Sequence, residues 1–245
     1  MDLQDVLEDV AAGETTVEEA RRAIDGYTRV DDFARLDTGR ADRAGIPEVV
    51  LGDGKSIEHL RSIALSFLEE RGHVVLTRVD EAAVDTLDGV AHDIDWYPES
   101  RILVLQTAAY EPPEPDGTVA VVSGGTADVP VAEEAAVTAR EMGCTVETFY
   151  DVGVAGIHRI LSEADALART DAVVVAAGRE GALPTVVAGL VDVPVIGLPV
   201  SIGYGHGGGG EAALAGMLQS CTVLSTVNID AGFVAGAQAA QIART

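Results

Sequence analysis

The sequence contains almost no lysine and few basic residues of any kind. Only 16 of its 245 residues are basic, Lys55 is the single lysine, and 40 acidic residues bring the formal net charge to −24. A negative field of this size repels nucleic acids and anionic lipid surfaces, so neither is an expected partner. Many acidic residues with little lysine are typical of a protein surface adapted to high salt. Salt screens the repulsion between the negative charges of such a surface. An ordinary acidic cytosolic protein is the alternative.

Cysteines and long apolar runs are scarce as well. The two cysteines, Cys144 and Cys221, are too few for the disulfide framework of a small secreted protein. No apolar run approaches the roughly 20 residues that span a bilayer. The N-terminus MDLQDVLEDV is acidic and lacks the layout of a signal peptide. We therefore expect a cytoplasmic protein without membrane association.

Aromatic residues make up only 4% of the chain, whereas hydrophobic residues make up 47%. A core of Ala, Val, Leu and Ile is typical of α/β proteins, in which parallel strands are covered on both faces. The segment AAYEPPEPDG (108–117) has the turn and linker composition that separates domains. We place the boundary there, with a helical plus small α/β domain over residues 1–110 and a second domain over residues 111–245.

Residues 3–24 are expected to be helical, with Thr15 or Thr16 capping a second segment, and residues 27–43 form a polar stretch. In the second domain the strand patterns TVAVVS, TVETFY, DAVVVAAG and VPVIGLP alternate with helical patterns. This alternation predicts a doubly wound parallel sheet in three layers. Ligands of such sheets bind beyond the carboxyl ends of the strands, so functional residues are expected at those positions.

The first strand of that domain runs into SGGTADVPVAEEA. Gly124 and Gly125 allow a tight turn and close backbone approach, and Thr126 or Asp128 can cap the following helix. The free amides at such a helix start would suit a phosphate, although a well-made turn without a ligand explains the residues equally well. Asp128 fits better as a base or as an acceptor for a hydroxyl group than as a phosphate contact.

Two later strand ends carry further polar or glycine-rich loops. Arg179 and Glu180 follow the strand VVVAAG, where a solvated surface pair is the plain alternative. Six of the eight residues from 203 to 210 are glycine. Glycine loses more conformational entropy on folding than other residues do. A run of glycines therefore indicates either a mobile loop or backbone that lies against a ligand. The recurrence at three strand ends is what favours a binding site.

His158 and Arg159 fall in the first turn of a predicted helix, where they could act as an acid–base group and an anion contact, or simply be exposed. Cys144 leads into a core strand and is expected to pack there. Cys221 lies at a helix C-terminus, which raises a thiol pKa, so a reactive thiolate there needs a cationic partner. No zinc spacing is present, and acidic loops could hold Mg²⁺ only together with phosphates.

Taken together, these loops resemble the LarB family. The resemblance rests on SGGTADVPVAEEA, DVGVAGIHR, AAGREGALPTVVAGLVDVPVIGLPVSIGYG, the Cys221 segment with VNIDAGFVAG and, upstream, GRADRAGIPEVVLGDGK. It covers most of the chain from about residue 27 onward. The second half is also similar to aminoimidazole ribonucleotide carboxylase (PurE), which implies a PurE-like sheet. VSIGYG and GHGGGG differ from the commoner spellings of that loop.

The resemblance implies a pyridinium-3,5-biscarboxylic acid mononucleotide synthase. Such an enzyme carboxylates nicotinic acid adenine dinucleotide at C5 with CO₂, releases AMP, and supplies nickel-pincer nucleotide biosynthesis. It also implies a homo-octamer and Cys221 as covalent nucleophile, with Glu180 matching a family glutamate. No tightly bound cofactor is expected, with Mg²⁺ as the one candidate metal.

The residues expected to act fall into two sets. The catalytic set is Cys221, Glu180, Asp128 and His158. The substrate-binding set is Ser123, Gly124, Gly125, Thr126, Arg159, Arg179, Ser201, Gly203, Tyr204, Gly205, Arg43 and Lys55. Two alternatives stay open: a carboxylase or mutase acting on aminoimidazole ribonucleotide, and a nucleotide-binding domain without catalysis.

Overall fold

The computed structural model describes residues 3–244, except for the side chains of Glu18, Arg22 and Ala23. The chain forms two compact units, Met1–Trp96 with Ile102–Tyr110, and Tyr97–Arg101 with Glu111–Thr245. The two units therefore adjoin along the chain inside the proline-rich segment 108–117. None of the described helices has both the length and the apolar character that a membrane span requires.

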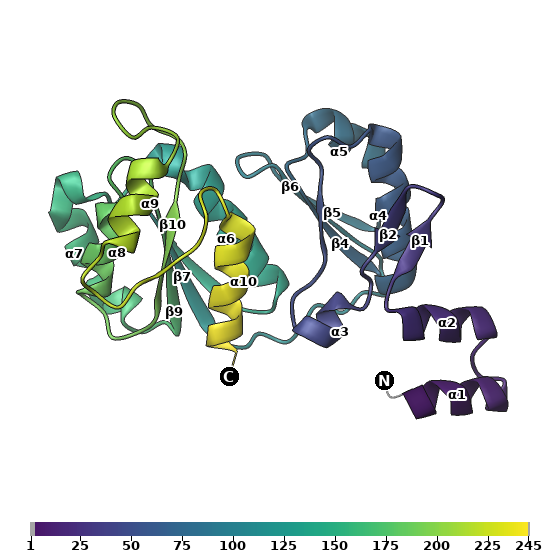
Figure 1. Cartoon of the computed structure of the whole chain (residues 1–245). Helices are drawn as coiled ribbons and strands as arrows, with labels where there is room; N and C mark the ends of the chain where they lie inside the picture. Colours follow the sequence, from purple (N-terminus) through teal and green to yellow (C-terminus); the bar gives the residue numbers. More distant parts are fainter. Residues whose placement is uncertain (1–2, 245) are drawn as a thin grey trace. The chain divides into compact units, whose positions relative to one another are not determined.

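The first unit pairs a small sheet with helices (Figure 1). Its helices are α1 (Leu3–Ala12), α2 (Val17–Asp25), α3 (Arg40–Ala44), α4 (Ile57–Arg71) and α5 (Glu81–Leu87). Its strands are β1 (Thr28–Val30), β2 (Ala34–Leu36), β3 (Val49–Leu51), β4 (His73–Thr77), β5 (Asp93–Tyr97) and β6 (Ile102–Gln106). The order β3-β4-β6-β5 forms a 4-stranded sheet, and β1 and β2 pair separately.

Local capping explains where the first helices begin and end. The Thr16 hydroxyl accepts from the Glu19 backbone, and the Glu19 carboxylate accepts from the Thr16 backbone at 2.7 Å. This reciprocal pair separates α2 from α1 and identifies which of the two predicted threonines is the cap. Ser56 caps α4 at its start, and Gly72 ends it in the left-handed conformation that favours glycine.

Two parts of the first unit differ from the expectation. The polar stretch 27–43 contains β1, β2 and the start of α3. Strand β5 is the second difference, because no strand was expected for DIDWY. Its Ile94 and Trp96 alternate with exposed aspartates and pack half-buried against the core, which is the period-2 pattern of a strand.

The second unit is a parallel α/β sheet in three layers, as expected. Its strands are β7 (Thr118–Ser123), β8 (Thr145–Phe149), β9 (Ala172–Ala177), β10 (Val195–Pro199) and β11 (Ser225–Thr226). They form a 5-stranded sheet in the order β11-β10-β9-β7-β8, and every pair is parallel. Along the chain, β8 follows β7 and lies on one side of it in the sheet, and β9 comes next and lies on the other side of β7. The topological switch point therefore lies between β7 and β9.

Helices cover both faces of this sheet (Figure 1). They are α6 (Val129–Glu141), α7 (Ile157–Leu167), α8 (Ala182–Ala188), α9 (Glu211–Leu218) and α10 (Gly232–Ala243). Side chains of α7, α8 and α9 share a buried cluster with β7 and β9. Helices α6 and α10 pack against each other and against the other face.

The close contact of α6 with α10 depends on glycine. A Cβ atom on Gly236 would lie 2.3 Å from the Ala135 carbonyl oxygen of α6 and 2.9 Å from the Thr138 Cβ. Backbone and β-branched atoms cannot move aside as the tip of a long side chain can. The spacing of these two helices, and so the covered face of the sheet, is fixed by the absence of a side chain at this position.

We predict that Gly236→Ala lowers the free energy of unfolding by about 1–3 kcal/mol, because overpacking outweighs the better helix propensity of alanine. Urea unfolding at one salt concentration measures this. Gln238→Ala, on the exposed face of the same helix, is the matched control and should change stability by less than about 0.5 kcal/mol. Equal effects of the two substitutions would contradict the packing argument.

Candidate active site

The loops after β7, β8, β9 and β10 converge at the carboxyl edge of the second sheet. A Cβ atom on Gly178, just after β9, would lie 2.6 Å from the Ile202 carbonyl oxygen and 3.2 Å from Asp128 Oδ1. A Cβ atom on Gly153, after β8, would lie 2.5 Å from the Gly124 carbonyl oxygen. Four strand ends thus meet with backbone against backbone, at the edge where the topology places ligands.

Asp128 is the buried acid of this edge, with 8% of its surface exposed. Its Oδ2 accepts a hydrogen bond from the Gly125 amide at 2.8 Å, and the Gly178 amide also bonds the carboxylate. Burial raises the pKa of Asp128, against the opposing effect of these two amides. A carboxylate whose pKa is raised is a stronger base, so Asp128 suits proton transfer.

The β8 end is held by side chains that were expected to bind substrate. The Arg159 guanidinium pairs with the Asp151 carboxylate at 2.9 Å and donates to the backbone carbonyls of Asp151 and Gly153. Ser123 is fully buried, and its hydroxyl accepts from the Asp151 amide at 3.1 Å. These contacts position the β8 loop, and binding of substrate by Ser123 and Arg159 stays a prediction.

His158 and Thr126 are exposed at the same edge, His158 in the first turn of α7 and Thr126 at the start of the short helical turn Thr126–Asp128. Cys144, as expected, is buried in the packing, and burial raises the pKa of its thiol. These placements leave Asp128 as the acid–base candidate at the switch point itself.

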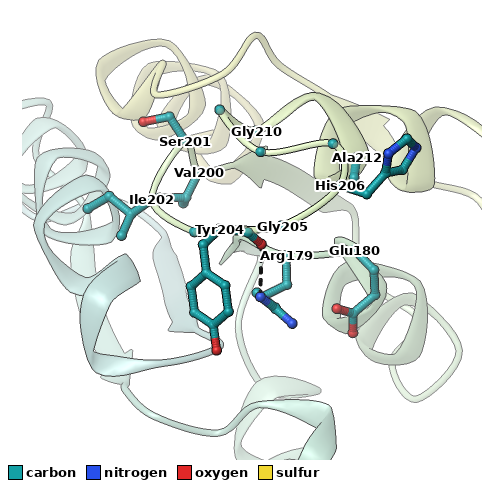
Figure 2. Close-up of a pocket in the computed structure, with 14 residues that line it drawn as sticks. Arg179, Glu180, Val200, Ser201, Ile202, Tyr204, Gly205, His206, Gly210 and Ala212 are labelled. Atoms are coloured by element: carbon teal, nitrogen blue, oxygen red, sulfur yellow. Dashed lines mark hydrogen bonds between the residues drawn. The ribbon is translucent and has the colours of Figure 1, made fainter.

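The glycine-rich loop after β10 encloses a cavity of about 240 Å³ (Figure 2). That volume is below the range of roughly 300–1,000 Å³ typical of whole ligand sites, so the cavity fits one part of a larger ligand. It is lined by Arg179, Glu180, Val200, Ser201, Ile202, Gly203, Tyr204, Gly205, His206, Gly207, Gly208, Gly209, Gly210 and Ala212. The predicted residues Arg179, Glu180, Ser201, Gly203, Tyr204 and Gly205 thus lie together.

Glycine is required at particular points of this loop. Gly210 has a φ of +82°, and a Cβ atom there would lie 2.7 Å from the Ile229 side chain. The loop begins at Ser201, whose amide donates to Asp230 Oδ1 at 2.8 Å. Sequence reasoning did not single out Asp230 or Asp151. The available signal was that each aspartate closely follows a strand pattern, in VNID and ETFYD.

Arg179 joins the loop to the end of β9. Its Nη1 donates to the Tyr204 carbonyl at 3.0 Å, and its guanidinium lies 4.6 Å from the centroid of the Tyr204 ring. Glu180 comes next, exposed at the rim of the cavity, and Gly216 of α9 packs against its backbone carbonyl. Arg179 and Glu180 therefore present a cation and a carboxylate at the same opening.

Cys221 lies at the opposite end of α9 from this cavity. The helix starts directly after the glycine-rich loop. Its eight residues extend about 12 Å and end at Leu218. The segment then returns to β11, which pairs with Ile196 and Gly197 in the first half of β10. Cys221 is exposed and is not among the described residues that line the cavity. Cys221 therefore lies on the segment that leads from α9 back toward the first half of β10.

Arg43 and Lys55 belong to the first unit, where both have local partners. Arg43 pairs with the Asp37 carboxylate at 2.7 Å, and Lys55 donates to the Leu51 carbonyl at 2.7 Å. Their binding role stays a prediction. Among residues 3–244, no three His, Cys, Asp or Glu side chains group as metal ligands would.

Comparisons with known proteins match both units of the chain. Residues 27–107 match the family described as the LarB/PurE-like N-terminal domain, and residues 118–245 match the family described as AIR carboxylase. The uncharacterized protein MJ0165 of Methanocaldococcus jannaschii is 36% identical over 254 residues, which cover 99% of this chain and 97% of that protein. The two domain types therefore occur here in one chain, in that order.

The raised pKa of Asp128 predicts a specific pH dependence of stability. A carboxyl whose pKa is higher in the folded protein destabilises the fold once it ionises, so stability falls as pH rises from about 3.9, its usual pKa, to the raised value. Asp128→Asn should remove that fall. Urea unfolding of both proteins from pH 3 to pH 8 tests this, with the exposed Asp165→Asn as control. Parallel curves for wild type and Asp128→Asn would contradict it.

Proposed function

The chain belongs to the LarB family, with a C-terminal domain of the AIR carboxylase type, and we propose that it carboxylates the pyridinium ring of nicotinic acid adenine dinucleotide. The family makes it a carboxylase-type enzyme. The product of the proposed reaction, after release of AMP, is pyridinium-3,5-biscarboxylic acid mononucleotide, a precursor of the nickel-pincer nucleotide. One arrangement supports this most: a buried carboxylate with raised pKa, a glycine-rich cavity and an arginine without a carboxylate partner lie at one sheet edge of the described chain.

The chemistry requires a nucleophile, because a pyridinium ring is itself electrophilic and its C5 does not attack CO₂. In the proposal, the Cys221 thiolate adds at C4 and gives a dihydropyridine whose enamine places electron density on C5. C5 then bonds to the carbon of CO₂. A base removes the C5 proton, and the C4–S bond breaks to restore the aromatic ring. This is nucleophilic catalysis, which divides one inaccessible step into easier ones.

Asp128 is the proposed base for the C5 proton. It lies buried at the switch point, and burial raises its pKa toward the pH at which proton transfer is most efficient. His158 is the second candidate, but it is exposed at the start of α7. Backbone amides of Gly124, Gly125 and the glycine-rich loop would bind the phosphates.

Glu180, at the rim of the cavity, is the proposed residue that orients water for cleavage of the phosphoanhydride. The water adds to phosphorus, and AMP leaves. The described residues contain no preformed metal cluster, so any Mg²⁺ would be bound mainly by the substrate's phosphates, with Glu180 among its protein ligands.

Within one chain, Cys221 lies beyond the end of α9, on the segment that leads to β11, and not in the loops at the carboxyl edge. The cysteine is exposed, and the apolar side chains beside it are exposed too, Leu218 at 67% and Val223 at 96%. Such a patch is typical of a contact surface. We therefore propose that the enzyme is a homo-oligomer, in line with the expected octamer, in which Cys221 of one copy meets substrate held at the sheet edge of another.

A second candidate reaction is carboxylation of aminoimidazole ribonucleotide, which the match over residues 118–245 favours. That substrate is already an enamine, so its reaction needs no thiol. The two candidates therefore differ in their dependence on Cys221.

We predict that wild type incubated with nicotinic acid adenine dinucleotide and labelled bicarbonate incorporates label into a mononucleotide and releases AMP. Cys221→Ser should lower label incorporation on the order of a thousandfold or more, because the covalent step is lost. Cys144→Ala, which removes the other thiol, is the control and should retain activity. Labelling of aminoimidazole ribonucleotide by wild type and Cys221→Ser alike would favour the second candidate.

The shared site predicts complementation between two inactive variants. Cys221→Ser copies retain Asp128, and Asp128→Asn copies retain the thiol. Co-assembled one to one, they should regain activity at about a quarter of the sites, since each site takes one residue from each of two copies. The same two proteins assembled separately and then mixed are the control. Absence of recovery on co-assembly would place both residues in one chain's site.

A further inference from the structure

Arg179 is held in an unusual backbone conformation directly at the cavity. Its φ is +51°, a left-handed value that costs energy for a residue with a side chain. That conformation places its guanidinium under the glycine-rich loop, against the Tyr204 ring (Figure 2). A glycine or asparagine would adopt this φ more easily. Arg78 and Arg101 share a positive φ, and Arg179 differs from them in lining the cavity.

Several described arginines lack a carboxylate partner, Arg61 and Arg169 among them, but Arg179 is the arginine that lines the cavity among residues 3–244. Arg159 pairs with Asp151, Arg40 pairs with Glu48, and Arg71 pairs with Asp42, each within 3.0 Å. Across the described part of the chain, residues 3–244, Arg179 has no carboxylate partner, and its contacts are the Tyr204 carbonyl and ring. At the cavity, an arginine free of carboxylates leaves an anion subsite open.

The chemistry of the pair specifies what that anion would be. A guanidinium carries five N–H donors. After one of them has bonded a carbonyl, two neighbouring N–H groups can still bind the two oxygens of a carboxylate. Tyr204 is 83% exposed, and its ring can stack with a cationic aromatic ring. A planar, positively charged ring that carries a carboxylate satisfies both residues at once.

We infer that Arg179 and Tyr204 form the subsite that recognises the carboxylate and ring of the pyridinium, and so select the acid over its amide. The inference rests on the proposed function for the identity of the substrate. A carboxamide has one oxygen acceptor, and its NH₂ group is a donor that cannot bond the N–H groups of the guanidinium. It therefore forms one of the two hydrogen bonds that a carboxylate forms. Arg179 is thus a specificity-determining residue, and Tyr204 binds the ring common to both ligands.

The test measures binding rather than turnover, by calorimetry at one fixed salt concentration. Two ligands are compared, nicotinic acid adenine dinucleotide and nicotinamide adenine dinucleotide, which differ only in the group on the ring. Wild type should bind the acid about tenfold to a hundredfold more tightly, as expected for charge-assisted hydrogen bonds. Arg179→Gln should remove this preference by weakening the acid alone, and Arg179→Lys, which keeps the charge but not the two neighbouring N–H groups, should lose most of it.

The other variants separate the roles. Tyr204→Leu should weaken both ligands by a similar factor and leave their ratio unchanged. Arg169→Gln, an exposed arginine after α7, is the matched control and should behave as wild type. If Arg179→Gln weakens both ligands equally, Arg179 binds the phosphates or the adenylate that the two share, and the inference is wrong.

Further outcomes distinguish the inference from the proposed function. A wild type with no preference, or a preference that survives Arg179→Gln, overturns the inference even if the labelled product forms. The wild type could instead prefer the acid through Arg179 and yet form no labelled product. That result would support the inference and contradict the proposed carboxylation.

Discussion

The approach of backbone to backbone at Gly178 is the constraint on which the site depends. Only a residue without a side chain leaves room there for the Ile202 carbonyl on one side and the Asp128 carboxylate on the other. This contact closes the gap between β7 and β9 at the switch point and buries Asp128, and burial is what raises the pKa of that carboxyl. The raised pKa of Asp128 is therefore a consequence of packing between strand ends.

Charge imposes a second constraint on the same edge. A protein with a formal net charge of −24 repels an anionic dinucleotide unless cations or amides act locally. Arg159, which was expected to help, is occupied in holding the β8 loop. The structure leaves Arg179 and the backbone of the glycine-rich loop for that task. A surface adapted to salt would tolerate the remaining repulsion, because salt screens exposed charges.

Much of the fold could be predicted because apolar strands and amphipathic helices alternate visibly along the second half of the chain. The same pattern indicated that Asp128, Arg179 and Glu180 follow strands, which places them at one edge. The pattern could not show which side chains hydrogen-bond within the protein itself, as the Ser123 hydroxyl does by accepting from the Asp151 amide. Nor could it show that α9 separates Cys221 from the glycine-rich loop, since closeness along the chain suggested closeness in space.

The central claim is that one substrate spans residues which a single chain keeps apart: the sheet edge with Asp128 and Arg179, and an exposed cysteine from a neighbouring copy. A crystal structure of Cys221→Ser with nicotinic acid adenine dinucleotide tests this most directly. The account predicts the pyridinium ring at the carboxyl ends of β7 and β9, with position 221 of another copy beside C4. A ring bound elsewhere, or at that edge with no copy's position 221 nearby, would contradict it.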